Sequence, residues 1–238
     1  MRQSLALFSL VLIGCNPPMN TETNGPICEK VKVDLHGDFY PFALNRFILP
    51  MDNKQFAIDV NGDGKVDNQF GSLMATLAMQ GIKVQEAADQ AAAAGPSVSL
   101  LRVQALDLKT DSTVGLTWYA GKVAGDMFSV DDTVSPALFI GKLDGGRYKS
   151  SDPVRTKTPV SLTIALSFIP GEPPVRVPLH GAQAEFTAGS DPSSGVPMLV
   201  DGRLRGSIKA SEVAQIPIFK AIFASDVQIY DDMGNYAP

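Results

Sequence analysis

Oxygen-bearing side chains recur at alternate positions in one short stretch of the chain, residues 59–70. Counted from Asp59, carboxylates or amides stand at the first, third, fifth and ninth positions, and a glycine stands at the sixth. Calcium takes about six to eight oxygen ligands, and a glycine allows the sharp turn that wraps a short backbone around the ion. The spacing therefore predicts a calcium loop in which the backbone carbonyl of the seventh residue also binds. The predicted metal ligands are Asp59, Asn61, Asp63, Lys65 and Asp67.

The twelfth position of this loop is Phe70, where a hand-shaped calcium loop normally has a bidentate glutamate. The missing ligands would come from Asn68, from water, or from a carboxylate elsewhere, such as Asp52 or the acidic tail after residue 225. The alternative is a tight turn without a metal, since Asp, Asn and Gly are also the residues that turns prefer. We expect a structural ion, because crowded acidic side chains repel one another until a cation neutralises them.

Over about ten residues this EF-hand-like loop resembles the calcium loops of extracellular modules of the dockerin and thrombospondin-repeat kind. Those loops also use Asp-x-Asn/Asp-x-Asp-Gly with non-standard completion. The resemblance implies a weak structural site, with a dissociation constant on the order of 10⁻⁴ to 10⁻³ M.

The first fourteen residues have the pattern of a secretion signal. Arg2 precedes an apolar run over 5–13, which is far shorter than the roughly 20 residues of a membrane-spanning helix. The run ends in Leu-Ile-Gly-Cys15, which is similar to the lipobox of bacterial lipoproteins. That resemblance implies export, removal of 1–14, lipidation of Cys15 and anchoring in the outer membrane, on its periplasmic face or at the cell surface. Residues 15–26 would form a polar tether. If the signal peptide is of the ordinary kind, a disulfide between Cys15 and Cys28 is the alternative.

Composition indicates one compact β-rich domain over 27–238. Of 238 residues, 45% are hydrophobic, and 21 glycines with 17 prolines favour many turns. The formal net charge is −5 at pH 7. We therefore expect no binding of nucleic acid, which needs clustered Lys and Arg.

Periodicity places a small helical part directly after the loop and strands beyond it. Apolar residues recur at helical spacing over 70–81, and an Ala-rich stretch over 84–94 predicts a second helix. Alternation of apolar and polar residues then predicts strands, and residues 211–224 form a third helix candidate. The expected fold is mainly β, an antiparallel sandwich or jelly-roll-like body with helices following the calcium loop. The predicted strands cover 31–35, 100–108, 114–122, 137–142, 160–168, 175–186 and 198–209.

The chain offers little for catalysis. It has two histidines, His36 and His180, and lacks the Gly-x-Ser-x-Gly and His-Glu-x-x-His motifs. We expect no catalytic residues and no enzymatic activity. Trp118 and Tyr119 are adjacent on a predicted strand, so one ring faces the core and the other faces solvent, where it could stack on a sugar. A carbohydrate- or envelope-binding module is thus one alternative function. A glycan-active hydrolase, which needs two facing carboxylates, is another.

The lipobox, the tether, the acidic loop and the later runs Leu-His180-Gly-Ala and Asp201-Gly-Arg-Leu-Arg-Gly together resemble uncharacterised secreted lipoproteins of gliding or predatory soil bacteria. That resemblance implies no activity. The sequence predicts a calcium-binding, lipid-anchored envelope or cell-surface protein with a binding or structural role. Its expected partners are the membrane, through Cys15, and an envelope glycan or protein.

Overall fold

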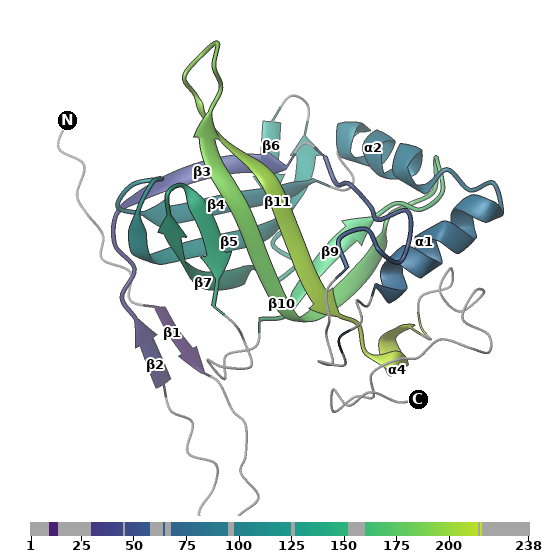
Figure 1. The fold of residues 1–238 in the computed structure, drawn as a ribbon, viewed down its shortest axis with the longest axis horizontal. Helices are drawn as coiled ribbons and strands as arrows, with labels where there is room; N and C mark the ends of the chain where they lie inside the picture. The colour runs from purple at the N-terminus through teal and green to yellow at the C-terminus, as the bar shows by residue number, and fades with distance from the viewer. Residues whose placement is uncertain are drawn as a thin grey trace, which may run out of the picture.

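The structure is a computed structural model that describes residues 10–13, 30–44, 46–57, 64, 68–94, 98–124, 127–151, 160–213 and 215. Most of its regular structure is antiparallel β, with two eleven-residue helices and one short helix (Figure 1). The helices are α1 (Gln69–Met79), α2 (Val84–Ala94) and α4 (Ala210–Val213). The strands are β1 (Leu10–Ile13), β2 (Lys30–Val33), β3 (Asp38–Leu44), β4 (Ser99–Ala105), β5 (Asp111–Ala124), β6 (Met127–Val130), β7 (Ala137–Asp144), β8 (Arg147–Ser150), β9 (Leu162–Leu166), β10 (Val175–Ser190) and β11 (Pro197–Ser207).

Nine strands form one continuous sheet in the order β11-β10-β8-β7-β5-β4-β3, with β6 paired to β5 and β9 paired to β10. All of these pairings are antiparallel. The long strand β10 pairs with β9 through its first residues and with β8 and β11 through its later ones, so it joins two parts of the sheet. In Figure 1, β10 and β11 cross in front of β4 and β5, so the sheet turns back over its own inner face.

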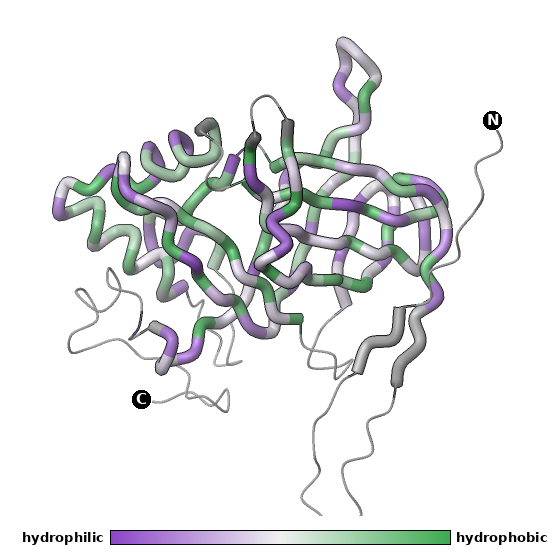
Figure 2. Tube along the Cα trace, turned by 180° about the vertical axis from the view of Figure 1, so that it is seen from behind, coloured by the Kyte–Doolittle hydropathy of each residue, from purple (hydrophilic) through white to green (hydrophobic). Residues whose placement is uncertain are grey.

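Strict alternation explains why the central strands form and which side they bury. In β4 the residues facing inward are buried and those facing outward are not, and β7 and β9 show the same pattern. The Tyr148 ring stacks on Phe186 with centroids 4.6 Å apart, and its hydroxyl donates a hydrogen bond of 3.1 Å to the Phe139 carbonyl. Burial raises the pKa of Tyr148. Figure 2 shows hydrophobic residues recurring along the strands, as this inner core requires.

The helices close one end of that core, beside β9 (Figure 1). In α1 the residues Leu73, Met74 and Leu77 are almost fully buried, and they belong to the same apolar cluster as the sheet. Their i, i+1, i+4 positions place them on one side of the helix. The chain turns at Gly81, whose φ of 82° suits a glycine, and then enters α2. The helices therefore share the core of the sheet.

A segment before the predicted loop is tied to α2 by side chains. The Gln85 amide donates a 2.8 Å hydrogen bond to the Phe47 carbonyl, and its oxygen accepts one of 2.9 Å from the Leu49 amide. Arg46 donates two 3.1 Å hydrogen bonds to Asp89. The Arg46 guanidinium is the main cause that lowers the pKa of Asp89. These contacts fix the path of the chain as it approaches residue 50.

The predicted fold class is confirmed: the structure is mainly antiparallel β with a small helical part after the loop. Both predicted helices are present, and six of the predicted strands correspond to β4, β5, β7, β9, β10 and β11. The predicted strand over 31–35 partly coincides with β2, which pairs with β1 in a separate two-stranded sheet. Strand β1 lies within the predicted signal segment, so cleavage before Cys15 would remove it. Of the predicted helix over 211–224, the structure describes 211–213, which lie in α4, and residue 215.

The aromatic run 39–42, which lies outside every predicted strand, belongs to edge strand β3, whose residues alternate between faces. Tyr40 and Phe42 pack against the core, whereas Phe39 faces outward and is 49% exposed. Pro41 is compatible with this strand because an edge strand has a side that needs no ladder hydrogen bond.

Candidate functional site

Most residues of the predicted calcium loop lie outside the described residues. Asp59, Asn61, Asp63, Lys65 and Asp67 are all in this group, as is the predicted lipidation site, Cys15. Gly64 is described, and its φ of 81° is the left-handed conformation that favours glycine at a sharp turn. What the structure describes in detail is how the two ends of the loop are held.

Asn68, near the end of the loop, is bonded to the chain that precedes the loop. Its side-chain oxygen caps α1 by accepting a 2.8 Å hydrogen bond from the Gly71 amide. Its side-chain amide donates a 2.7 Å hydrogen bond to the Gln55 carbonyl. One residue therefore starts the helix and holds the chain before the loop against the chain after it.

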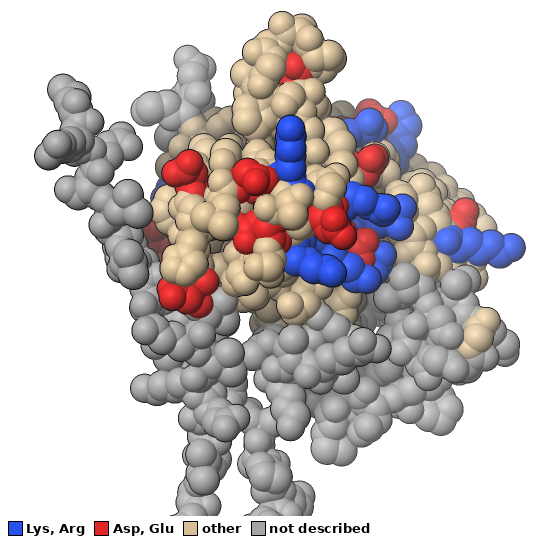
Figure 3. Space-filling model, turned by 60° about the vertical axis from the view of Figure 1, so that its left-hand side comes forward, with Lys and Arg blue, Asp and Glu red and all other residues tan. Residues whose placement is uncertain are grey.

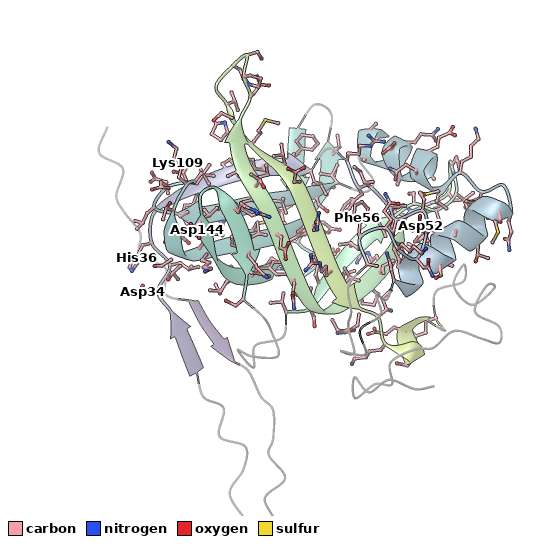
Figure 4. All side chains as sticks on the ribbon, in the orientation of Figure 1. Asp34, His36, Asp52, Phe56, Lys109 and Asp144 are labelled. Atoms are coloured by element: carbon pink, nitrogen blue, oxygen red, sulfur yellow. The ribbon has the colours of Figure 1, made fainter. Side chains whose placement is uncertain are left out.

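A compact turn forms the other side of this junction. The Asp52 carboxylate accepts 2.7 Å hydrogen bonds from the amides of Lys54 and Gln55, with the Lys54 bond the larger cause of its lowered pKa. Phe56 adopts a φ of 59°, which is uncommon for a residue with a side chain. A methyl group placed on Gly71 would overlap the Asp52 carbonyl oxygen, so the turn lies directly against the first turn of α1. Figure 4 shows Asp52 and Phe56 close together beside α1.

Phe70, which replaces the usual twelfth-position glutamate, packs inward. Its ring makes an edge contact with Phe168 at a centroid distance of 6.4 Å, and Phe168 is buried. The position that supplies a metal ligand in an EF-hand loop here supplies an apolar contact to the core. Any ion bound by the loop would thus act on a helix that is already fixed in the core.

Trp118 and Tyr119 face opposite sides of the sheet, as the alternation along this strand predicts. Trp118 is 5% exposed and packs on Phe47, with ring centroids 6.0 Å apart. Trp118 is therefore the ring of this pair that belongs to the core, and Tyr119 is the one left to meet a ligand. Tyr119 lies on the outer face and is half-buried.

Tyr119 belongs to an aromatic and cationic group that we call the Arg102 platform, formed by Phe39 on β3, Arg102 on β4 and Tyr119 on β5. The Arg102 guanidinium carbon lies 4.8 Å from the centre of the Phe39 ring and 5.5 Å from that of Tyr119. These distances are within the range of cation–π contacts. Sequence reasoning missed Phe39 and Arg102. The alternation in 100–105 could have placed Arg102 on the outer face, but the cross-strand register that gathers the three side chains is not encoded in any local pattern.

The two histidines have local partners. His180 Nε2 lies 2.8 Å from both carboxylate oxygens of Glu212 on α4, and His180 Nδ1 lies 3.3 Å from the Ser161 hydroxyl. This arrangement connects α4 to β10 and to the residue before β9. His36 lies 3.4 Å from Asp34 in an exposed turn, at the end of the sheet far from α1 (Figure 4).

Within the part of the chain that the structure describes, no cluster of three or more His, Cys, Asp and Glu side chains is placed to hold a metal ion. The described helices include none long and apolar enough to cross a membrane. Comparisons with protein families, with curated proteins and with solved structures found no significant match. The function is therefore inferred from the residues and their geometry.

Proposed function

We propose that this chain is a lipid-anchored protein of the cell envelope or surface whose β-rich body is stabilised by one calcium ion in residues 59–70. It acts by binding a partner or as a structural component. The observation that supports the calcium site best is the 2.7 Å hydrogen bond from the Asn68 side chain to the Gln55 carbonyl. This bond brings together the two ends of a segment whose oxygen-bearing residues have calcium-loop spacing.

Closing the loop in this way favours ion binding for two reasons. The cost of bringing the loop ends together is met by the fold, so the ion does not have to supply it. The closed segment also contains three carboxylates, Asp59, Asp63 and Asp67, whose mutual repulsion a divalent cation would remove. Because α1 begins one residue after Asn68 and packs in the core, binding should stabilise the whole domain.

Thermal unfolding with calcium and with chelator tests this proposal. For a dissociation constant on the order of 10⁻⁴ to 10⁻³ M, calcium at about 10 mM contributes about 1.4 to 2.7 kcal/mol. This corresponds to a rise in Tm of roughly 3 to 10 °C for a domain of this size. Asp63→Asn should abolish most of the rise, whereas Asp144→Asn, at the opposite end of the sheet (Figure 4), should leave it unchanged. Equal Tm values in calcium and chelator would refute the calcium site.

The anchor is tested separately. If Cys15 is lipidated, cells fed a labelled fatty acid should label the protein, and globomycin should block its maturation. Cys15→Ser should abolish the label, while Cys28→Ser should retain it. An unlabelled protein that matures normally with globomycin would refute the anchor and leave the calcium proposal intact.

The Arg102 platform favours a second candidate function, a carbohydrate-binding module. Aromatic rings on an open sheet face give sugars an apolar surface, and Tyr119 and Phe39 provide two such rings. Binding to a glycan array that is lost in Tyr119→Ala would support it. Absence of binding to every glycan on the array would count against it.

A further inference from the structure

We propose that the Arg102 platform binds an acidic sugar, with the Arg102 guanidinium holding the sugar carboxylate and the rings of Phe39 and Tyr119 contacting the apolar face of the sugar ring. The inference rests on the second candidate function above and specifies its ligand class. The evidence for it is the position of Arg102 between two rings and the charge of its guanidinium.

The sheet register explains how the platform forms. Arg102 is opposite Pro41 on β3 and Thr117 on β5, so Phe39 and Tyr119 are its diagonal neighbours on the two flanking strands. Diagonal neighbours on one face of a sheet are within reach of long and aromatic side chains. The three strands therefore place one cation between two rings. Figure 2, the view from behind, shows none of the described helices crossing these strands on the outer side.

The charge of Arg102 is not neutralised by any ion pair among the described residues, whereas three other arginines are paired. Arg46 contacts Asp89, Arg176 contacts Asp131, and Arg205 contacts Glu185. Charged side chains of both signs lie next to one another over the side of the molecule seen in Figure 3. Arg147 and Arg203 also have no ion pair in the described part of the chain, so what distinguishes Arg102 is its position between two aromatic rings.

These features match a carboxylated sugar better than a neutral one. A guanidinium can donate two parallel hydrogen bonds to a carboxylate, while ring faces accept the C–H side of a sugar. The hydroxyl of Thr117, opposite Arg102, is of the type that bonds sugar hydroxyls. A single cation suits a single carboxylate. Nucleic acid would need several phosphate contacts on a chain with an excess of acidic residues.

Calorimetric titration of the whole protein, purified in detergent, tests this inference. The probes are trimers of galacturonate, mannuronate and glucuronate, each compared with its methyl ester, which has the same sugar ring without the charge. Chelator is present so that calcium cannot bridge the acids to the protein. At least one free acid should bind about 10- to 100-fold more tightly than its ester, since a hydrogen bond to a charged group has that effect.

The variants separate charge from ring contacts. Arg102→Gln should reduce the affinity for the acid to that for the ester, and Arg102→Lys should recover part of it, because lysine keeps the charge but loses the paired hydrogen bonds. Tyr119→Ala should weaken acid and ester alike. Arg147→Gln, an exposed arginine on β8 outside the platform, should change neither. Unfolding curves establish that each variant is folded.

Three results would overturn the inference. Equal binding of acid and ester would leave a neutral sugar site and refute the role of Arg102. No binding of any trimer would refute the carbohydrate-binding function as well, without bearing on calcium, which the melting experiment tests. Tighter binding of single-stranded oligothymidylate than of every acid, with loss in Arg102→Gln, would assign the platform to nucleic acid.

Discussion

Replacing Asn68 tests whether the junction between the predicted loop and α1 holds the fold together. Asn68→Ala removes both the cap to Gly71 and the hydrogen bond to the Gln55 carbonyl. A lost asparagine cap costs about 1 kcal/mol, with a range of about 0.5 to 2. The second hydrogen bond contributes about 1 ± 0.5 kcal/mol. Asn68→Ala should therefore reduce the free energy of unfolding by about 2 kcal/mol.

Asn68→Ser separates the two contributions. Serine caps helices about as well as asparagine but has no amide to donate to Gln55, so its expected cost is about 1 kcal/mol. Urea denaturation in chelator measures both variants without a contribution from calcium. The midpoints should follow the order wild type, Asn68→Ser, Asn68→Ala, with equal slopes. Equal losses in the two variants would show that the cap contributes nothing, and losses below about 0.5 kcal/mol in both would refute the proposed junction.

Three further predictions concern single side chains. Gln85→Ala should cost about 2 to 3 kcal/mol in urea denaturation, since two backbone groups of the preceding segment lose their partner, whereas Gln90→Ala on the same helix should be nearly neutral. Ser167→Ala should be neutral or stabilising by up to about 1 kcal/mol, because the Ser167 hydroxyl is buried without a hydrogen-bond partner among the described residues; a loss above about 1 kcal/mol would contradict this. The hydrogen bond from the Ser193 hydroxyl is the main cause that lowers the pKa of Asp191 from 3.8 to about 2. The ionised Asp191 carboxylate therefore contributes to stability above about pH 4, and this contribution is lost between about pH 4 and 2. Asp191→Asn should remove this part of the acid destabilisation, and an unchanged pH profile would refute it.

Local patterns were sufficient to predict α1, α2 and six of the strands. Strand β9 and the inward residues of β4 follow strict alternation, and α2 ends next to Gly95, so composition and period agree with the fold. Strands β6 and β8 have four residues each, which is too few to show a periodic pattern in the sequence. They form because β6 pairs with β5 and β8 pairs with β7. Strand β3 was missed because Pro41 interrupts its pattern, and an edge position makes that proline tolerable.

The candidate sites also differ in whether they depend on local sequence or on tertiary contacts. The proposed calcium loop rests on a local pattern, because its expected ligands are close in sequence and their spacing follows from the geometry of the ion. The role of Asn68 in joining this segment to Gln55 depends on a tertiary contact and could not be predicted. The same is true of the Arg102 platform, whose three residues are 63 and 17 positions apart in sequence and meet only through the register of β3, β4 and β5.

The most direct test of the calcium site is a crystal structure of the protein grown in millimolar calcium, with anomalous scattering used to locate the ion. We predict one ion within about 2.3 to 2.6 Å of side-chain oxygens from Asp59, Asn61 and Asp63 and of the Lys65 carbonyl. A well-ordered loop with those oxygens directed into solvent and no anomalous peak at its centre would contradict the proposal.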